Sequence, residues 1–206
     1  MLTSHIKARA KSFLDDTSGN ITVEFVLVMP ILFWTFMASY VFFDGYRQSA
    51  NNLKAANTIS DLVSRETAAI NNNYVDSMVN LLSLMTRTPS DVDLRLSVIR
   101  WDQADDRYYL DWSANRGYPN ELTNANIGDL ADRLPVMPDN ERVILVETNN
   151  VFVPLFNVGL GDINLENFVF SRPRFVSQVV FEGMNQGDDG TQDDGYDADT
   201  NNIVTN

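Results

Sequence analysis

The chain has 206 residues and a formal net charge of −13, so nucleic acid and anionic lipid headgroups are unfavourable partners because both are negatively charged. It contains no cysteine, which excludes disulfides, thiolate metal sites and cysteine nucleophiles. Its single histidine, His5, lies in the amino-terminal segment, and this excludes a histidine-based catalytic triad in the rest of the chain.

Residues 1–19 are predicted to form a short cytoplasmic leader. Lys7, Arg9 and Lys11 give it three positive charges, which Asp15 and Asp16 partly offset. Positive charge beside a membrane segment favours the cytoplasmic side. We therefore expect the amino terminus inside the cell and the body of the chain outside the cytoplasm.

An apolar run follows over residues 21–43, and Glu24 is its only Asp, Glu, Lys or Arg residue. At about 1.5 Å per residue the run forms a helix of roughly 34 Å, enough to cross a hydrocarbon core of about 30 Å. We expect a transmembrane helix over residues 20–43. A cleaved secretory signal is the competing interpretation, but the run is longer than the apolar core of such a signal and no small-x-small cleavage site follows Phe43.

The start of this run carries a specific motif. Gly19 directly precedes it and Glu24 is the fifth residue after Gly19, which resembles the site where a membrane peptidase cuts type IV prepilins. More closely, Gly-x-x-x-Val-Glu-Phe with Pro30 six residues after the glutamate resembles the TadE/TadF family of minor pilins of tight-adherence (Flp-type) pili. Asn20 departs from the prepilin pattern, in which a large apolar residue is usual.

The resemblance implies a structural role, not an enzyme. Prepilin peptidase would cut between Gly19 and Asn20, and Glu24 would serve assembly. The implied partners are other pilus subunits, the inner-membrane assembly platform, the peptidase and membrane lipid, with no nucleic acid. The chain would lie in the bacterial inner membrane with its head in the periplasm, or in the extracellular pilus. A single-pass anchored periplasmic accessory protein that binds partners without polymerising stays open as the alternative.

Two helices are expected before any strand. Apolar or small residues continue at spacings of three and four beyond the membrane run, which predicts one helix over about residues 21–70 with an amphipathic second half. Asn73 is the predicted N-cap of a second helix, with Asp76 helping to satisfy its first turn. That helix should extend to Thr86, ahead of Pro89.

The remainder to residue 181 predicts strands, which makes the fold α+β and pilin-like, with an antiparallel sheet of about four strands packed on the long helix. Residues 92–98 and 107–113 alternate apolar and polar side chains around a turn at 102–105 and so predict a hairpin. Pro173 within the last strand indicates an edge strand or a bulge. The other expected elements are a short helix at 127–134, a strand at 142–153, a helical turn at 154–160 and a strand at 168–181.

The aromatic-proline segment at residues 152–156 and the Arg-Pro-Arg at residues 172–174 also resemble the end of TadE/TadF-like proteins, which extends the resemblance to about residues 19–181. Arg172 and Arg174 have two interpretations. They are solvated charges on an edge strand, the reading that the sequence favours, or they meet an acidic patch on a neighbouring subunit.

Residues 182–206 are rich in acidic residues and glycine and contain no Lys or Arg, so a solvated, disordered tail is expected. Calcium is the alternative, because Asp193, Asp197, Asp199 and Asn201 supply oxygen ligands at alternating positions. A full calcium loop also needs a closing glutamate, which is missing, so the solvated tail is favoured and no other cofactor is expected.

Little in the body predicts catalysis. Gly159 and Gly161 do not follow the pattern of a phosphate-binding loop because no lysine accompanies them. Asp105 and Asp106 are adjacent in a turn, where paired carboxylates usually face water. The expected organisation is a leader at residues 1–19, a transmembrane segment at 20–43, an exported head at 44–181 and an acidic tail at 182–206.

Overall fold

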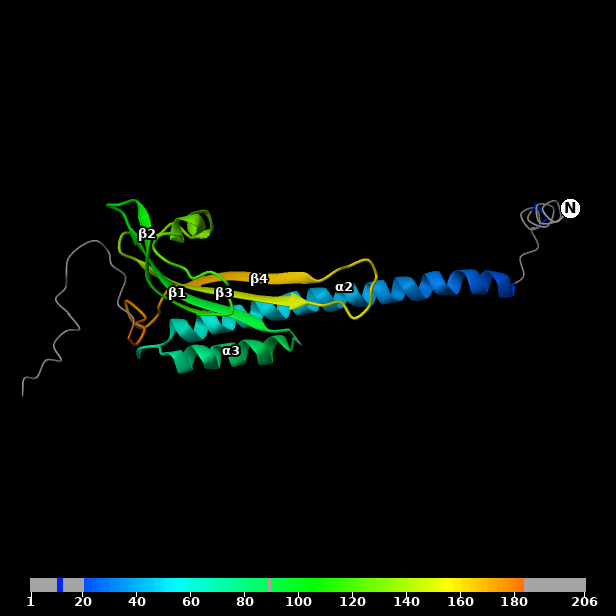
Figure 1. Cartoon of the computed structure of the whole chain (residues 1–206), viewed down its shortest axis with the longest axis horizontal. Coiled ribbons are helices and arrows are strands. Elements are labelled where there is room, and N and C mark those ends of the chain that lie inside the picture. The colour runs from blue at the N-terminus through cyan, green and yellow to red at the C-terminus, as the bar shows by residue number, and fades with distance from the viewer. Residues whose placement is uncertain (1–10, 13–20, 89, 184–206) are drawn as a thin grey trace, which may run out of the picture. The chain divides into compact units, whose positions relative to one another are not determined.

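The computed structural model describes residues 11–12, 21–88 and 90–183, and it has the α+β composition that the sequence predicts (Figure 1). The chain divides into two compact units. Unit 1 holds Met1–Tyr46 and Val153–Gly161, and unit 2 holds Arg47–Phe152 and Asp162–Asn206. The elements are α2 (Ile21–Ser64), α3 (Asn72–Thr86), β1 (Val92–Asp102), β2 (Arg107–Arg116), the 3-10 helix η1 (Ile127–Arg133), β3 (Arg142–Phe152) and β4 (Ile163–Ser171).

The long helix α2 is continuous, as expected, but it ends at Ser64 and not near residue 70. Beyond Ser64 the chain leaves the helix, and Ile70 pairs with residues 180–182 near the end of the described chain. Ile70 forms a bridge with Phe181, the Ile70 amide donates to the Val180 carbonyl at 2.8 Å, and the Glu182 amide donates to the Ile70 carbonyl at 2.7 Å. A helix that continued to residue 70 would need these backbone groups of Ile70, and the Ser64 carbonyl at the observed end accepts from the Arg174 amide at 2.8 Å.

The second helix, α3, forms where the sequence predicts it, but its N-cap is Asn71 and not Asn73. Asn71 has an extended backbone, and its side chain accepts a hydrogen bond from the Tyr74 amide at 3.0 Å. The expected capping partner, Asp76, instead pairs with Arg116 at 2.6 Å. Arg87 ends the helix in the left-handed conformation with φ of 51°.

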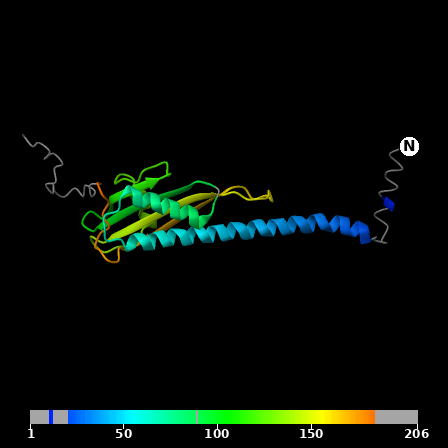
Figure 2. The ribbon, with the colours of Figure 1, turned by 90° about the horizontal axis from the view of Figure 1, so that it is seen from below.

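The four strands form one antiparallel sheet in the order β2-β1-β3-β4, which confirms the predicted sheet. In unit 2, one face of this sheet packs against α3 and the second half of α2 (Figure 2). Ser60 of α2 also donates to Ser171 of β4 at 2.8 Å, which ties the helix to the sheet edge. The main core lies in this layer and includes Ala55, Ile59, Val63, Val75, Met78, Leu82, Leu94, Leu96, Val98, Ile144 and Val146.

A second, smaller core lies on the opposite face of the sheet. It is covered by η1, which confirms the predicted short helix at 127–134 as a 3-10 helix, and by the adjoining loops. Its buried members are Ile99, Leu110, Leu122, Ile127, Leu134, Met137, Val143 and Leu145. Both faces of the central strands are therefore buried, which accounts for the apolar run Val143–Val146 in β3, whereas β1 keeps Arg95 and Ser97 among its apolar residues.

Two predictions for the end of the sheet are wrong. The last strand covers Ile163–Ser171 and not 168–181, and it ends before Pro173, which lacks the amide that a strand would use. It is an edge strand of the sheet. The expected helical turn at 154–160 is irregular, and its turn is closed by a hydrogen bond from the Gly159 amide to Asn157 Oδ1 at 3.3 Å. Gly159 has φ of 92°, which glycine adopts without strain.

Candidate functional site

The first half of α2 in unit 1 carries a continuous apolar surface. Among the described residues, α2 is the one helix that is long and apolar enough to span a membrane, and only 11% of its apolar window is buried. Leu27, Leu32 and Phe36 are each more than half exposed. A helix in the core of a globular domain would bury such side chains. This surface therefore needs a covering that the described part of the chain does not supply.

The polar side chains within the apolar run make local hydrogen bonds. Thr35 donates to the Ile31 carbonyl at 2.8 Å, and Ser39 donates to the Thr35 carbonyl at 2.9 Å. Both hydroxyls are satisfied by their own helix, so they add little cost in an apolar environment. They line a shallow groove of about 580 Å³ on the helix together with Val28, Ile31, Leu32 and Phe36.

Glu24 is the acidic residue in the first turn of α2, and its side chain is exposed. A carboxylate there interacts favourably with the positive end of the helix dipole. Among the described residues, no hydrogen bond or ion pair involves the Glu24 carboxylate. Gly19 and Asn20, the predicted cleavage site, lie outside the described residues.

The predicted calcium ligands Asp193, Asp197, Asp199 and Asn201 also lie outside the described residues. Within the described ranges, no group of three or more histidine, aspartate or glutamate side chains is arranged to hold a metal ion. Calcium binding by these four residues therefore stays a prediction from the sequence.

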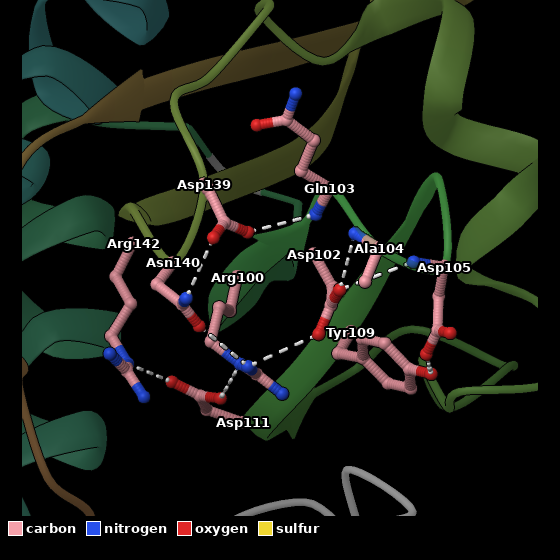
Figure 3. Close-up of polar contacts among 10 residues, drawn as sticks. All are labelled: Arg100, Asp102, Gln103, Ala104, Asp105, Tyr109, Asp111, Asp139, Asn140 and Arg142. Atoms are coloured by element: carbon pink, nitrogen blue, oxygen red, sulfur yellow. Dashed lines mark hydrogen bonds and ion pairs between the residues drawn. The ribbon is translucent and has the colours of Figure 1, made fainter.

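Unit 2 contains a cluster of ion pairs at the start of β3, which we call the charged cluster: Arg100, Asp102, Asp111, Asn140 and Arg142 (Figure 3). A β-bulge places Asp111 in it, because the pairing changes from Val98↔Trp112 to Ile99↔Leu110 and leaves Asp111 as the extra residue. Arg100 and Arg142, paired in neighbouring strands, both approach this carboxylate.

The charged cluster satisfies its own charges. Asp111 Oδ2 accepts from Arg142 Nε at 2.7 Å and from the Gln178 side chain at 3.3 Å, while Asp111 Oδ1 lies 4.0 Å from Arg100 Nε. Arg100 also donates to Asn140 Oδ1 at 3.0 Å. Because both carboxylate oxygens face guanidinium groups, this arrangement fixes the sheet and the segment around Gln178, and it offers no free base for proton transfer.

Both aspartates of the hairpin turn beside the cluster, Asp105 and Asp106, are exposed, as the sequence predicts, and Asp105 also accepts a hydrogen bond. The Tyr109 hydroxyl donates to Asp105 Oδ2 at 2.5 Å, and this hydrogen bond, with burial, raises the pKa of Tyr109. Arg107 lies over the Tyr109 ring, 4.5 Å from its centroid. Asp106 occupies the left-handed region with φ of 52° and is exposed.

A second buried ion pair, Arg95–Glu147, lies on the η1 face of the central strands and was not predicted. Arg95 Nε donates to Glu147 Oε2 at 2.6 Å and Arg95 Nη2 donates to Glu147 Oε1 at 2.8 Å, a bidentate geometry. Arg95 also donates to the Asn120 carbonyl at 3.0 Å and lies 4.8 Å from the centroid of the Tyr118 ring. A charged residue inside each of two apolar strands was the available signal.

Arg172 and Arg174 lie beyond the end of β4, so the interpretation as edge-strand charges is wrong in its placement. Both side chains remain more than half exposed, and both pair within the chain. Arg172 Nε lies 2.6 Å from Glu141 Oε1, and Arg174 Nη2 lies 2.8 Å from Asp61 Oδ1. The Arg174 amide also donates to the Ser64 carbonyl at 2.8 Å, which holds this segment against the end of α2.

No protein-family model matches the chain, and neither a curated protein nor a solved structure matches it.

Proposed function

We propose that the chain is a minor pilin or pseudopilin of a tight-adherence (Flp-type) pilus, a structural subunit that serves pilus assembly and surface adhesion. One observation carries the proposal. A single unbroken helix presents bare apolar side chains along its first half and contributes Ala55, Ile59 and Val63 to a folded core along its second half.

The exposed apolar side chains on the first half of α2 determine what kind of partner can cover it. Each Å² of apolar surface left in water costs about 25 cal/mol, so more than a dozen exposed large apolar side chains require an apolar partner. Lipid supplies that partner while the subunit is held in the membrane. The α2 helices of other subunits supply an equally apolar one in a fibre. A subunit of this kind passes from the first environment to the second without exposing the helix to water.

The groove on α2 fits contact with another helix. Thr35 and Ser39 are one turn apart on it, and small side chains at that spacing let two helix backbones approach closely in an apolar environment. Their hydroxyls already donate within the helix, so a neighbouring helix meets no unsatisfied donor there. This supports assembly through α2.

Glu24 links processing to assembly in this proposal. Cleavage after Gly19 creates an α-amino group at Asn20, which is positively charged over most of the physiological range. Glu24 lies about one helical turn from that position and can pair with this amine or with the amine of an incoming subunit. The carboxylate then gains a partner that exists only after cleavage.

Amino-terminal sequencing of protein extracted from membranes tests the proposal, combined with detection of the chain in fibres sheared from cells. Asn20 as the first residue and presence in the fibres support a pilus subunit. An intact Met1 and absence from the fibres, with the chain retained in the membrane, instead identify an anchored periplasmic accessory protein.

A further inference from the structure

The loop between β3 and β4, Val153–Gly161, contains no charged residue, and we call it the apolar loop. It belongs to unit 1 together with the first half of α2. Leu155 is 69% exposed and Val153 is 56% exposed, although a loop of a water-soluble head would carry polar side chains at such positions. Such side chains in unit 1 call for the same kind of covering as the helix.

One contact sets the level of the apolar loop along α2. Phe156 packs edge-on against Tyr40 of α2, with ring centroids 6.3 Å apart, and the loop is drawn in yellow beside α2 in Figure 1. Tyr40 is three residues before Phe43, the last residue of the apolar run, so it lies about 5 Å from the end of that run along the helix axis. Tyrosine is enriched where a membrane passes from hydrocarbon to headgroups.

The backbone of the apolar loop limits how deeply it can lie. The segment carries no helix or strand, and its turn is closed by a bond from the Gly159 amide to a side-chain oxygen of Asn157. Backbone groups without such pairing cannot enter the hydrocarbon core, because no water is present there to satisfy them. The headgroup boundary contains water and still accepts apolar side chains to a depth of about 5–10 Å.

We propose that the apolar loop is a second membrane contact, in which Val153, Leu155 and Phe156 insert into the interfacial layer of the bilayer that α2 spans. The partner is a lipid surface without net charge, because the loop has no charged side chain and the strongly acidic chain disfavours anionic headgroups. The inference rests on membrane insertion of α2, which is part of the proposed function. A helix alone leaves the rotation of α2 about its axis free, whereas the loop fixes it.

The absence of cysteine allows a direct measurement. Single-cysteine variants of the full chain are spin-labelled and reconstituted in phosphatidylcholine bilayers, and their collision rates with oxygen and with a water-soluble nickel chelate are measured. Leu155→Cys is the test position. Phe36→Cys, on the bare face of α2, reports hydrocarbon. Val136→Cys, an apolar side chain of unit 2 that is 97% exposed, reports water.

The Leu155 label is expected to collide with the chelate several-fold less often than the Val136 label, at a depth shallower than that of the Phe36 label. Equal chelate collisions at Leu155 and Val136, with Phe36 in lipid, overturn the loop contact and leave the membrane anchor standing. Chelate access at Phe36 overturns insertion of α2 and the proposed function with it. Protection of Leu155 that disappears on dilution with excess lipid identifies a second copy of the chain as the occupant and overturns the proposal.

Discussion

The two halves of α2 belong to one helix but differ in where their apolar side chains lie: buried in the second half and exposed in the first. In unit 2 the apolar residues Ala55, Ile59 and Val63 recur at spacings of four and are fully buried, which is the pattern of a helix on a core. In unit 1 apolar residues surround the helix, and Leu32 and Phe36 are exposed. These exposed side chains do not take part in the core of unit 2, and we propose that lipid or another subunit covers them.

The two units also differ in whether their charged side chains are paired within the chain. Unit 2 places Arg95 opposite Glu147 and surrounds Asp111 with two arginines, so its buried charges are settled within the chain. The carboxylate of Glu24 in unit 1 has no such partner among the described residues. Unit 2 thus pairs its buried charges internally, whereas in our proposal the Glu24 carboxylate of unit 1 finds its partner only after cleavage.

The largest effect on folding is expected from Glu147→Gln, which removes one charge of the buried pair in unit 2. Leaving Arg95 buried without its partner costs about 3–5 kcal/mol. Chemical unfolding of the detergent-solubilised chain, followed by near-ultraviolet circular dichroism, measures this loss. The double variant Arg95→Met with Glu147→Leu is expected to recover most of it, since no unpaired charge remains. A double variant as unstable as the single one would contradict this account.

The next prediction compares the two halves of α2 by making the same substitution, isoleucine to alanine, once in each half and measuring the loss of stability. Ile59→Ala opens a cavity in the core of unit 2 and should cost about 2–5 kcal/mol. Ile31→Ala, on the bare half where the side chain is 68% exposed, should change the unfolding free energy of the head by less than about 0.5 kcal/mol. The same assay measures both variants. Similar losses at the two positions would show that the first half of α2 does stabilise the head.

Local patterns were sufficient to predict most elements but not the ends of several. The three- and four-residue spacing predicted α2, and alternation around the turn at 102–105 predicted the β1–β2 hairpin. The end of α2 depends on pairing between Ile70 and Phe181, far apart in sequence, which no local pattern contains. Asn71 and Asn73 are chemically equal candidates for the N-cap, so the choice depends on how the preceding residues are held.

The buried ion pairs could not be predicted from local sequence patterns either. The sequence contains Arg95 and Glu147 in strands, but their contact depends on the register that pairs them across β1 and β3. Asp111 joins the charged cluster through a bulge, a one-residue irregularity that alternation does not predict. By contrast, the bare half of α2 was predictable because an unbroken apolar run needs no tertiary information.

A modest effect of pH is expected in unit 2. Burial, followed by the nearby Glu147 carboxylate, raises the pKa of Tyr118 above its usual value near 10. Below that value the phenol is neutral in both states. As the pH rises through about 10, the unfolded tyrosine ionises first, so the folded state loses stability until Tyr118 itself ionises. Urea midpoints at about pH 9 and about pH 11 measure the loss. Tyr118→Phe should reduce it, and the exposed Tyr46→Phe should not.

The smallest effect on folding is expected from Glu24→Gln, which keeps the shape of the side chain and removes its charge. The helix dipole contributes at most about 1 kcal/mol at this first-turn position, and the head gains nothing from Glu24, so insertion and the unfolding of unit 2 should be unchanged. Cleavage after Gly19 should also proceed.

The same variant tests assembly. If Glu24 pairs with the new amine at Asn20, Glu24→Gln should abolish co-purification with other pilus subunits and attachment of cells to surfaces. Ser49→Ala, at an exposed position of the same helix outside the groove, is the control for a general disturbance of α2 and should retain attachment. A Glu24→Gln chain that assembles and attaches like the parent would mean that the carboxylate lies at the membrane interface and reaches water without a partner. The first half of α2 would then be an anchor alone, and the contrast between the two units would no longer point to a fibre.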